Sequence, residues 1–328
     1  MFFLIIHTIN RKKVNMKIRL GYVAITNALN ITSSSTITYT NFIKKQDYNI
    51  LYEIINNNLK ALEEILKYNI KNKIHFYRLT SKLIPLATHP DIKYDYIKPF
   101  LKEFTIISKI IKDNNLRIDV HPDQFAVLNS VKKEVIKNTI QILLYHYNIL
   151  HVLNIKDKII ILHVGSNAFG KQKSMTRFIN NFQKLPYYLK QCIAIENDDK
   201  IFSIVDCLYI ANELNIPVIL DYHHFICHNP ENINIEDVIL DVFKTWKNKT
   251  PKIHFSSPKG NSKKDFRSHH DYIDVMTFIS FIDKIKNINI DFDIMIEAKA
   301  KDDALFRLVR QLKYLTNYTF IDETTFII

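Results

Sequence analysis

Short apolar runs recur along the chain, each followed by a loop and then by a longer stretch of helical periodicity. Apolar runs rich in β-branched residues are typical of strands buried on both faces of a parallel sheet. The sequence predicts eight such strands, at Ile18–Tyr22, Ile74–Leu79, Leu116–Val120, Ile159–His163, Ile193–Glu196, Val218–Asp221, Ile253–Phe255 and Ile294–Glu297.

The stretches between these runs have the spacing of amphipathic helices, which parallel strands need as crossovers. They predict helices at about 50–68, 96–113, 132–153, 175–185, 202–215, 235–247, 272–286 and 302–316. Eight strand–helix units without a Pro-, Gly- or Ser-rich linker predict a single α/β domain over residues 16–328, folded as a (β/α)8 TIM barrel. Residues 1–15 precede the first strand as an N-terminal extension.

The composition is that of a globular protein with a basic surface. Of 328 residues, 47% are hydrophobic and 24% charged, which excludes disordered and fibrous proteins. The formal net charge of +12 favours a polyanionic partner, nucleic acid first, although an A+T-rich genome also produces Lys-rich usage. Three cysteines without a CxxC pair indicate a reducing, intracellular compartment. The opening apolar run is too short for a membrane helix and lacks the features of a signal peptide, so we expect a protein that is neither secreted nor transmembrane.

Residue types that bind metals stand at the ends of six predicted strands. They are His121, His163, Glu196, Asp221, His254 and Glu297. Each alone is more often a loop residue, a helix cap or an ion-pair partner. In a barrel, however, all strand ends meet at one mouth, and burying these groups together without a cation is costly. A mixed His, Asp and Glu set suits Zn²⁺, Mn²⁺ or Fe²⁺, and more than four ligands imply more than one ion, with Glu196 as a natural bridge.

Three further residues extend this predicted cluster. His224 lies three residues after Asp221, and His269 precedes the last helix–strand unit. Lys252 lies two residues before His254, so strand periodicity places both on the inward face. Burial beside metal ions lowers the pKa of a lysine, and a neutral amine can take up carbon dioxide to form a carbamate ligand. The alternative is that Lys252 extends outward to solvent.

Clustered metal ions at a basic barrel mouth suit in-line displacement at a phosphodiester. The candidate phosphate contacts are Lys171, Lys173, Lys259, Lys263, Lys264 and Arg267, although such residues are usually solvated loop positions. Gln124 and Phe125, directly after the third strand, form a polar and aromatic tip. Such a tip can wedge into a base stack, and Phe125 can equally pack against the rim.

The chain from Met16 to about Leu315 resembles the UV-damage endonucleases, whose barrel is related to that of type IV apurinic endonucleases. The motifs that carry the resemblance are Arg19-Leu20-Gly21-Tyr22, Ile84-Pro85 through His89-Pro90, His121-Pro122-x-Gln124-aromatic, Leu162-His163-Val164-Gly165, Glu196-Asn197-Asp198, Asp221-x-x-His224, Pro251-Lys252-Ile253-His254 and Glu297-Ala298-Lys299. Any one of them is weak, but their order at successive strand ends is specific.

The resemblance implies a metal-dependent DNA repair endonuclease that nicks duplex DNA 5′ to UV photoproducts. It implies three divalent ions, usually Mn²⁺ with Zn²⁺ as an alternative. The implied ligand groups are His121, His163 and Glu196; then Glu196, Asp221, His254 and Glu297; then His224, His269 and a carbamylated Lys252. His269 is preferred to His270 because the family pattern Arg-x-His-x-Asp-Tyr aligns with it.

The resemblance also implies roles at the substrate. His89 would lie close to the scissile phosphate, as a catalytic residue beside Glu196 and Lys252. The residues expected to contact the damaged DNA are Tyr22, Gln124, Phe125, Lys259 and Arg267. Many family members carry Tyr where this chain has Phe125, so a hydroxyl contact is lost while the ring can still stack.

Other functions remain open from the sequence. A type IV apurinic endonuclease would share the metal site and differ in substrate. A metal-dependent sugar isomerase or epimerase on the same barrel would need a small enclosed pocket and no positive groove. A non-catalytic DNA-binding module would bind metal without cutting. We expect a monomer that acts on duplex DNA, with no obligate protein partner and no membrane association.

Overall fold

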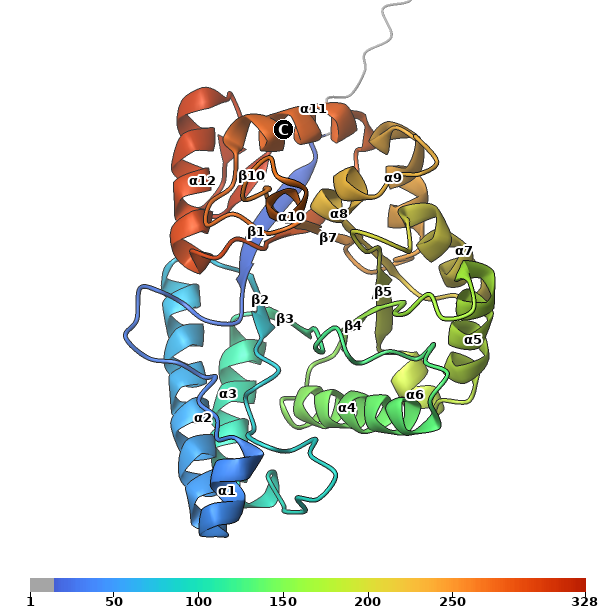
Figure 1. The fold of residues 1–328 in the computed structure, drawn as a ribbon. Coiled ribbons are helices and arrows are strands. Elements are labelled where there is room, and N and C mark those ends of the chain that lie inside the picture. Colours follow the sequence, from blue (N-terminus) through green and yellow to red (C-terminus); the bar gives the residue numbers. More distant parts are fainter. Residues whose placement is uncertain (1–14) are drawn as a thin grey trace, which may run out of the picture.

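Eight parallel strands form a closed barrel ringed by helices in the computed structural model, which describes residues 15–328 (Figure 1). The strands are β1 (Lys17–Val23), β2 (Phe76–Leu79), β3 (Arg117–Val120), β4 (Ile160–His163), β5 (Ile193–Glu196), β6 (Val218–Asp221), β7 (Lys252–Phe255) and β8 (Phe292–Ile296). Their bounds lie within two residues of the predicted ones, so the predicted barrel is confirmed. The predicted extension falls on residues 1–15, of which 1–14 lie outside the described part of the chain.

Each strand is followed by a helix that covers the outside of the barrel (Figure 1). These helices are α2 (Tyr48–Lys71), α3 (Leu101–Asp113), α4 (Lys133–Val152), α5 (Lys171–Gln183), α7 (Ile204–Leu214), α9 (Ile235–Lys244), α11 (Val275–Ile285) and α12 (Lys301–Leu315). The predicted start of α11 was three residues too early, because the Asp274 side chain caps this helix by accepting from the Thr277 N–H at 2.7 Å. None of the described helices is long and apolar enough to cross a bilayer.

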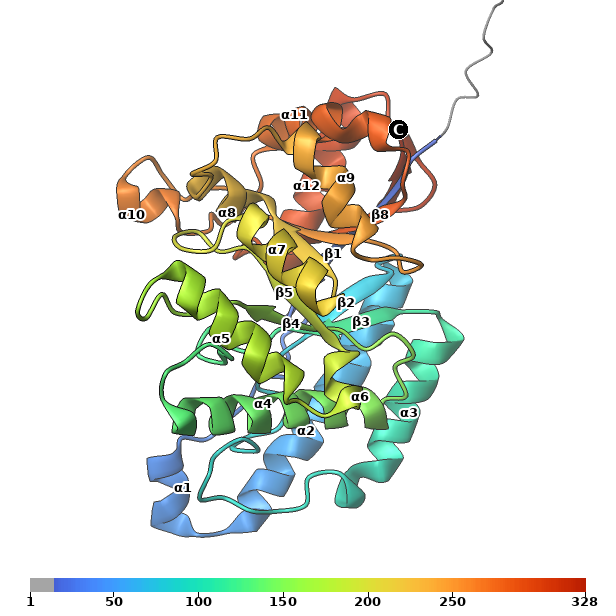
Figure 2. The ribbon, with the colours of Figure 1, turned by 90° about the vertical axis from the view of Figure 1, so that its right-hand side faces the viewer.

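Short helices lie in the connections between the strands and the long helices. They are α1 (Tyr39–Lys45), α6 (Tyr187–Lys190), α8 (Tyr222–Cys227) and α10 (Lys263–Phe266), with 3-10 turns at Lys98–Phe100 and Lys286–Ile288. Helices α1, α8 and α10 lie on one side of the molecule and the C-terminus lies on the other (Figure 2). Since α8 and α10 follow the ends of β6 and β7, that side is the barrel mouth.

A C-terminal hairpin, which the sequence did not predict, completes the closure. Its strands are β9 (Thr319–Phe320) and β10 (Thr325–Ile327). Strand β10 pairs antiparallel with the first half of β1, from Lys17 opposite Ile327 to Arg19 opposite Thr325. Strand β1 meets β2 only at its far end, where Tyr22 and Val23 are in register with Tyr77 and Arg78. The hairpin therefore fills the gap between β1 and β2 at the bottom of the barrel.

One half of the barrel interior is apolar. Ile159, Ile161, Ala194 and Ile219 form a small buried cluster with Trp246, separate from the large core between the strands and the outer helices. The Trp246 indole N–H donates to the Val218 carbonyl at 2.8 Å, which satisfies its polar atom. This cluster lies on β4, β5 and β6, below the predicted ligands His163, Glu196 and Asp221.

The other half of the interior holds buried charges. The guanidinium of Arg19 donates two hydrogen bonds to Asp293, at 2.6 and 2.8 Å, and Arg117 donates to the same carboxylate at 2.5 Å. Nearer the mouth, Lys252 and Arg78 both pair with Asp119. The carboxylates of Asp119 and Asp293 are almost completely buried, so each depends on these cations for its solvation.

Replacing Asp293 by Asn should destabilise the barrel, because Arg19 and Arg117 would keep their charges without a carboxylate. We expect the free energy of unfolding to fall by about 3–5 kcal/mol. Urea denaturation of the purified variant measures this loss. The matched control is Asp283→Asn, which breaks an exposed 3.4 Å pair with Lys286 and should change stability by less than about 0.5 kcal/mol. Equal losses in the two variants would contradict the stabilising role of Asp293.

Candidate metal centre at the barrel mouth

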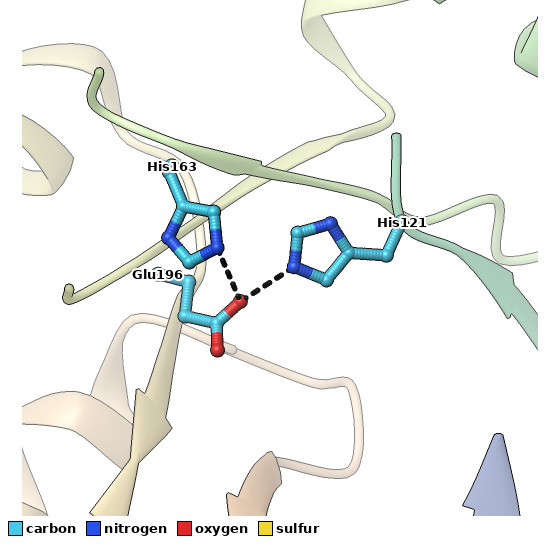
Figure 3. A group of neighbouring side chains, drawn as sticks. All are labelled: His121, His163 and Glu196. Carbon is cyan, nitrogen blue, oxygen red and sulfur yellow. Dashed lines mark hydrogen bonds and ion pairs between the residues drawn. The ribbon is translucent and has the colours of Figure 1, made fainter. Parts of the chain in front are cut away.

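Three overlapping groups of metal-binding side chains lie at the mouth of the barrel. They are His121, His163 and Glu196; Glu196, Asp221 and His254; and Asp221, His224 and His269. Within each group the ligand atoms all lie within 4.8 Å of one another. Glu196 and Asp221 each belong to two groups, so the three groups form one continuous cluster. Figure 3 shows the first group, in which both imidazoles point toward the Glu196 carboxylate.

Strand register brings these residues together. His163 on β4 lies beside Glu196 on β5, and Asp221 on β6 lies beside His254 on β7. Neighbouring residues in register point to the same face of a sheet, which here is the inside of the barrel. The structure thus brings seven of the nine predicted ligands together, and their binding of metal stays a prediction; Glu297 and Lys252 differ as described below.

Backbone carbonyls fix the tautomers of two histidines. The Nδ1 of His121 lies 3.0 Å from the Pro122 carbonyl, and the Nδ1 of His224 lies 2.9 Å from the Asn197 carbonyl. A carbonyl can only accept, so each Nδ1 carries a proton and donates it. The Nε2 atoms are then free to bind a cation, in the arrangement common to metal-binding histidines.

Two further atoms fit a bound cation. The Nε2 of His121 lies 2.8 Å from Glu196 Oε2, so a proton or a positive ion must lie between these two acceptors. The Oδ2 of Asp221 is buried and has no hydrogen-bond partner within the described chain. Buried carboxylate oxygens are rarely left unpaired, and a divalent ion would satisfy this one. The donor set, imidazole with carboxylate, suits Mn²⁺ or Zn²⁺.

The charges in the cluster shift its pKa values in opposite directions. Burial alone raises the pKa of Glu196, but His254, His163 and His121 outweigh it and hold that pKa well below its usual value. Burial lowers the pKa of His224, but the carboxylates of Asp221, Glu196 and Glu297 outweigh it and raise the pKa to about 9. Without metal, His224 therefore holds a proton at neutral pH, whereas burial lowers the pKa of His163 to about 4 and favours its neutral ring.

Arg78 is a part of the site that the sequence analysis missed. Its Nη1 donates to Glu297 Oε1 at 2.6 Å, and its Nη2 contacts the Nε2 of His254. Glu297 lies 3.1 Å from His254 but outside the three ligand groups, because Arg78 holds its carboxylate. An available signal was the position of Arg78, the only charged residue in the apolar strand β2.

Lys252 is buried in the barrel and does not extend to solvent, so that alternative is wrong. Its amine pairs with Asp119, one layer deeper than the predicted ligand His254. Burial lowers the pKa of Lys252 to about 8, against the opposing attraction of Asp119. Of the third predicted ligand group, His224 and His269 lie together, and a link between them and Lys252 stays a prediction.

The tip after β3 is the most exposed of the predicted DNA contacts. The Phe125 side chain is 77% exposed, and Gln124 beside it is also exposed, so Phe125 does not pack against the rim. Lys259 and Arg267 lie between β7 and α11. The Lys259 amine lies 3.8 Å from the Asp265 carboxylate, and the Arg267 guanidinium lies 3.7 Å from the Asp199 carboxylate.

Two other predicted residues lie outside the three groups. His89 is in the loop after β2, where its ring stacks on Tyr39 with centroids 4.0 Å apart. Tyr22 points outward from β1 and is fully buried, with its hydroxyl donating to Asn69 of α2 at 2.8 Å. In this structure Tyr22 is a packing residue and has no surface to offer DNA, contrary to the sequence prediction.

Comparison with known proteins identifies relatives along nearly the whole chain. A family model described as UV-endonuclease UvdE matches residues 18–325. A UV DNA damage endonuclease of Bacillus mycoides is 40% identical over 320 residues, which cover 94% of this chain and 99% of the relative. A UV DNA damage endonuclease of Bacillus cereus is 41% identical over 307 residues, which cover 90% of this chain and 95% of the relative.

Solved structures show how far the likeness extends. The crystal structure of SacUVDE superposes with a TM-score of 0.83 at 35% identity, over 91% of this chain and 99% of that one. Endonuclease IV from Thermus thermophilus gives a TM-score of 0.54 at 10% identity, over 90% of this chain and 98% of that one. A 3-keto-D-glucoside 4-epimerase from E. coli gives a TM-score of 0.55 at 10% identity, over 91% of this chain and 98% of that one. These two share the fold alone. On the family model and the relatives together, the chain belongs to the UV-endonuclease (UvdE) family.

Proposed function

We propose that this protein is a metal-dependent endonuclease that nicks duplex DNA on the 5′ side of UV photoproducts, leaving a 3′-hydroxyl and a 5′-phosphate. Membership of the UV-endonuclease family makes the chain a nuclease. The observation that carries the finer proposal is the continuous cluster of three ligand groups at an open barrel mouth, beside the exposed Phe125.

The cluster would hold three divalent ions, Mn²⁺ in preference to Zn²⁺. The proposed ligands are His121, His163, Glu196, Asp221, His224, His254, His269, Glu297 and a carbamylated Lys252. When bound, such ions lower the pKa of water and neutralise the charge that develops on a phosphodiester. Glu196 and Asp221 each belong to two groups, so these two carboxylates would hold neighbouring ions at a fixed spacing.

The remaining residues of the proposed site position the metal ligands and the substrate. Arg78 holds the Glu297 carboxylate through a 2.6 Å hydrogen bond and keeps it beside His254. His89, on the loop after β2, is proposed to contact the scissile phosphate. Lys252 is proposed to act through its carbamate, which its buried position beside Asp119 would shield from solvent.

Gln124 and Phe125 are proposed to probe the duplex. A photoproduct weakens base stacking, so a wedge inserted there meets less resistance than in intact DNA. Phe125 has the exposed ring that such a wedge requires. Lys259 and Arg267 would contact phosphates of the same duplex. One chain carries the whole cluster, so a monomer without a protein partner suffices.

The proposed reaction predicts metal-dependent nicking of one defined substrate. With added Mn²⁺, the protein should cut a duplex carrying a single thymine dimer on the 5′ side of the lesion, and a chelator should abolish the cut. Denaturing gel electrophoresis of end-labelled strands measures both. Glu196→Gln should lower the rate by more than about 100-fold, because even residues that support a metal ligand cost 10–100-fold, while DNA affinity stays close to that of the wild type.

The matched control is Glu213→Gln, at an exposed position of α7, which should cut like the wild type. An abasic duplex in the same assay separates the two nuclease functions: preferential cutting of the abasic strand would identify a type IV apurinic activity instead. Metal and DNA binding without any nick would indicate a non-catalytic module and would contradict the proposal.

Metal affinity should rise with pH. Without metal, the pKa of His224 is raised to about 9, so below pH 9 a binding ion must displace a proton from this ring. We expect the apparent affinity for Mn²⁺ to rise up to about tenfold per pH unit between pH 7 and 9. Isothermal titration calorimetry in two buffers of different ionisation enthalpy measures the proton released. His224→Gln should abolish the proton release that accompanies metal binding. The control His151→Gln, on the exposed end of α4, should leave it unchanged. A Mn²⁺ affinity independent of pH would contradict the assignment of His224 as a metal ligand.

The metal-loaded protein should carry a carbamate on Lys252. Burial lowers the pKa of Lys252 to about 8, so a fraction of the amine is neutral at mildly alkaline pH and can react with carbon dioxide. Native mass spectrometry should detect the mass of one added carbon dioxide, and Lys252→Ala should lower the bound metal. The control is Lys244→Ala, at an exposed position of α9. A fully active protein with an unmodified Lys252 would exclude this role.

A further inference from the structure

Phe169, in the loop between β4 and α5, combines high exposure with an unfavourable backbone. Its side chain is 76% exposed and its φ angle is +63°. A left-handed backbone is costly for a bulky residue, and an exposed ring does not recover that cost by packing. The residue that follows is Gly170, which adopts positive φ without penalty. The strain at Phe169 is therefore unexplained by the fold alone.

The surrounding hydrogen bonds hold Phe169 in this conformation. The Gly170 N–H donates to the Asn167 carbonyl at 3.1 Å, which closes a tight turn with Phe169 at its third position. The Ala168 carbonyl accepts from the Ser174 hydroxyl at 3.1 Å and from Arg177 at 2.5 Å. Gly or Asn normally occupies the third position of a turn with positive φ there. The turn thus presents an aromatic ring where a smaller residue would be less strained.

The loop of Phe169 is joined to the loop that carries Phe125. The Asn129 side chain pairs with Ser166 in both directions, donating to its carbonyl at 2.7 Å and accepting from its N–H at 2.9 Å. Arg177 also donates to the Asn129 carbonyl at 2.9 Å. These bonds tie the two loops into one rim of the barrel mouth. His121 directly follows β3 and His163 ends β4, and a loop with an exposed Phe follows each of these proposed ligands.

A groove beside Phe169 has the charge and apolar surface of a nucleic-acid contact. The groove has a cavity volume of about 520 Å³. Besides Phe169 it is lined by Val131, Lys133, Arg177 and Lys184, and none of its described lining residues is acidic. Val131 is 48% exposed and the two lysines are exposed. Cations that follow a phosphate backbone, with an aromatic ring on which a base can stack, are the usual elements of single-strand contacts.

We propose that Phe169 and this groove form a second DNA contact outside the metal centre. Phe169 stacks on a base that the lesion has loosened, and Lys133 and Lys184 contact phosphates of the same strand. Phe125 and Phe169 then hold the DNA at two points of one rigid rim. This inference rests on the proposed function, since it needs DNA at the barrel mouth.

The test measures binding of a short dimer-containing duplex by fluorescence anisotropy, with the full-length protein and Ca²⁺ in place of Mn²⁺. Phe169→Ala should weaken binding about tenfold, the loss typical of one base–aromatic stack. Lys133→Gln with Lys184→Gln should reduce the slope of log affinity against log salt by about 1.8, for two lost phosphate contacts. The matched controls are Tyr314→Ala, at an 88% exposed ring of α12, and Lys102→Gln with Lys284→Gln, all at exposed helix positions.

Phe169→Asn separates a binding role from a structural one. Asn tolerates positive φ, so this variant should melt at the same or a higher temperature than the wild type while binding DNA about as weakly as Phe169→Ala. A variant that melts lower and binds DNA normally would show that Phe169 is a packing residue and would overturn the proposal.

Failure of this inference is distinct from failure of the proposed function. One outcome is that the wild type nicks at the dimer while the Phe169 and lysine variants keep its affinity and salt slope. This outcome overturns the second contact and leaves the proposed endonuclease function intact. Binding that depends on Phe169 and the two lysines, in a protein that never nicks, supports the contact and contradicts the endonuclease. Absence of any DNA binding by the wild type overturns both.

Discussion

The compensation of buried charge inside the barrel is the constraint on which the rest of the structure depends. The lower interior places Asp293 between Arg19 and Arg117, and the layer above places Asp119 between Lys252 and Arg78. At the mouth, the carboxylates of Glu196, Asp221 and Glu297 outnumber the fixed cations, and of these three Arg78 pairs with Glu297. The negative charge of Glu196 and Asp221 suits the mouth to a bound cation, while the ion pairs of the layers beneath it join the strands that carry them.

Much of the fold and of the candidate metal-binding cluster follows from the sequence because two simple rules apply. A parallel barrel requires apolar runs with helices between them, and it brings every strand end to one place. A position at the end of an apolar run was therefore enough to predict that His163, Glu196 and Asp221 lie at the mouth. The sequence does not predict which of them share a candidate ligand group, because that depends on the register between strands.

The features that the sequence did not reveal depend on partners far along the chain. In the sequence, Arg78 is a single charge in a short strand. Its partner Glu297 lies 219 residues away along the chain, so their pairing is visible only in the folded structure. Tyr22 belongs to a motif that suggested a DNA contact, but alternation along β1 directs its ring outward onto Asn69. The hairpin of β9 and β10 is too short to give a pattern of its own. The barrel fold is shared with an epimerase at 10% identity, so the fold alone does not argue for function.

The late pairing of β1 has a consequence for the biosynthesis of the protein. The lower half of this strand emerges from the ribosome early, but its neighbour β10 lies at residues 325–327. Until those residues are made, β1 has an open edge whose amide and carbonyl groups can pair with another nascent chain. The bottom of the barrel can therefore close only after residues 325–327 have been made, so this edge is completed last although β1 is the first strand of the barrel.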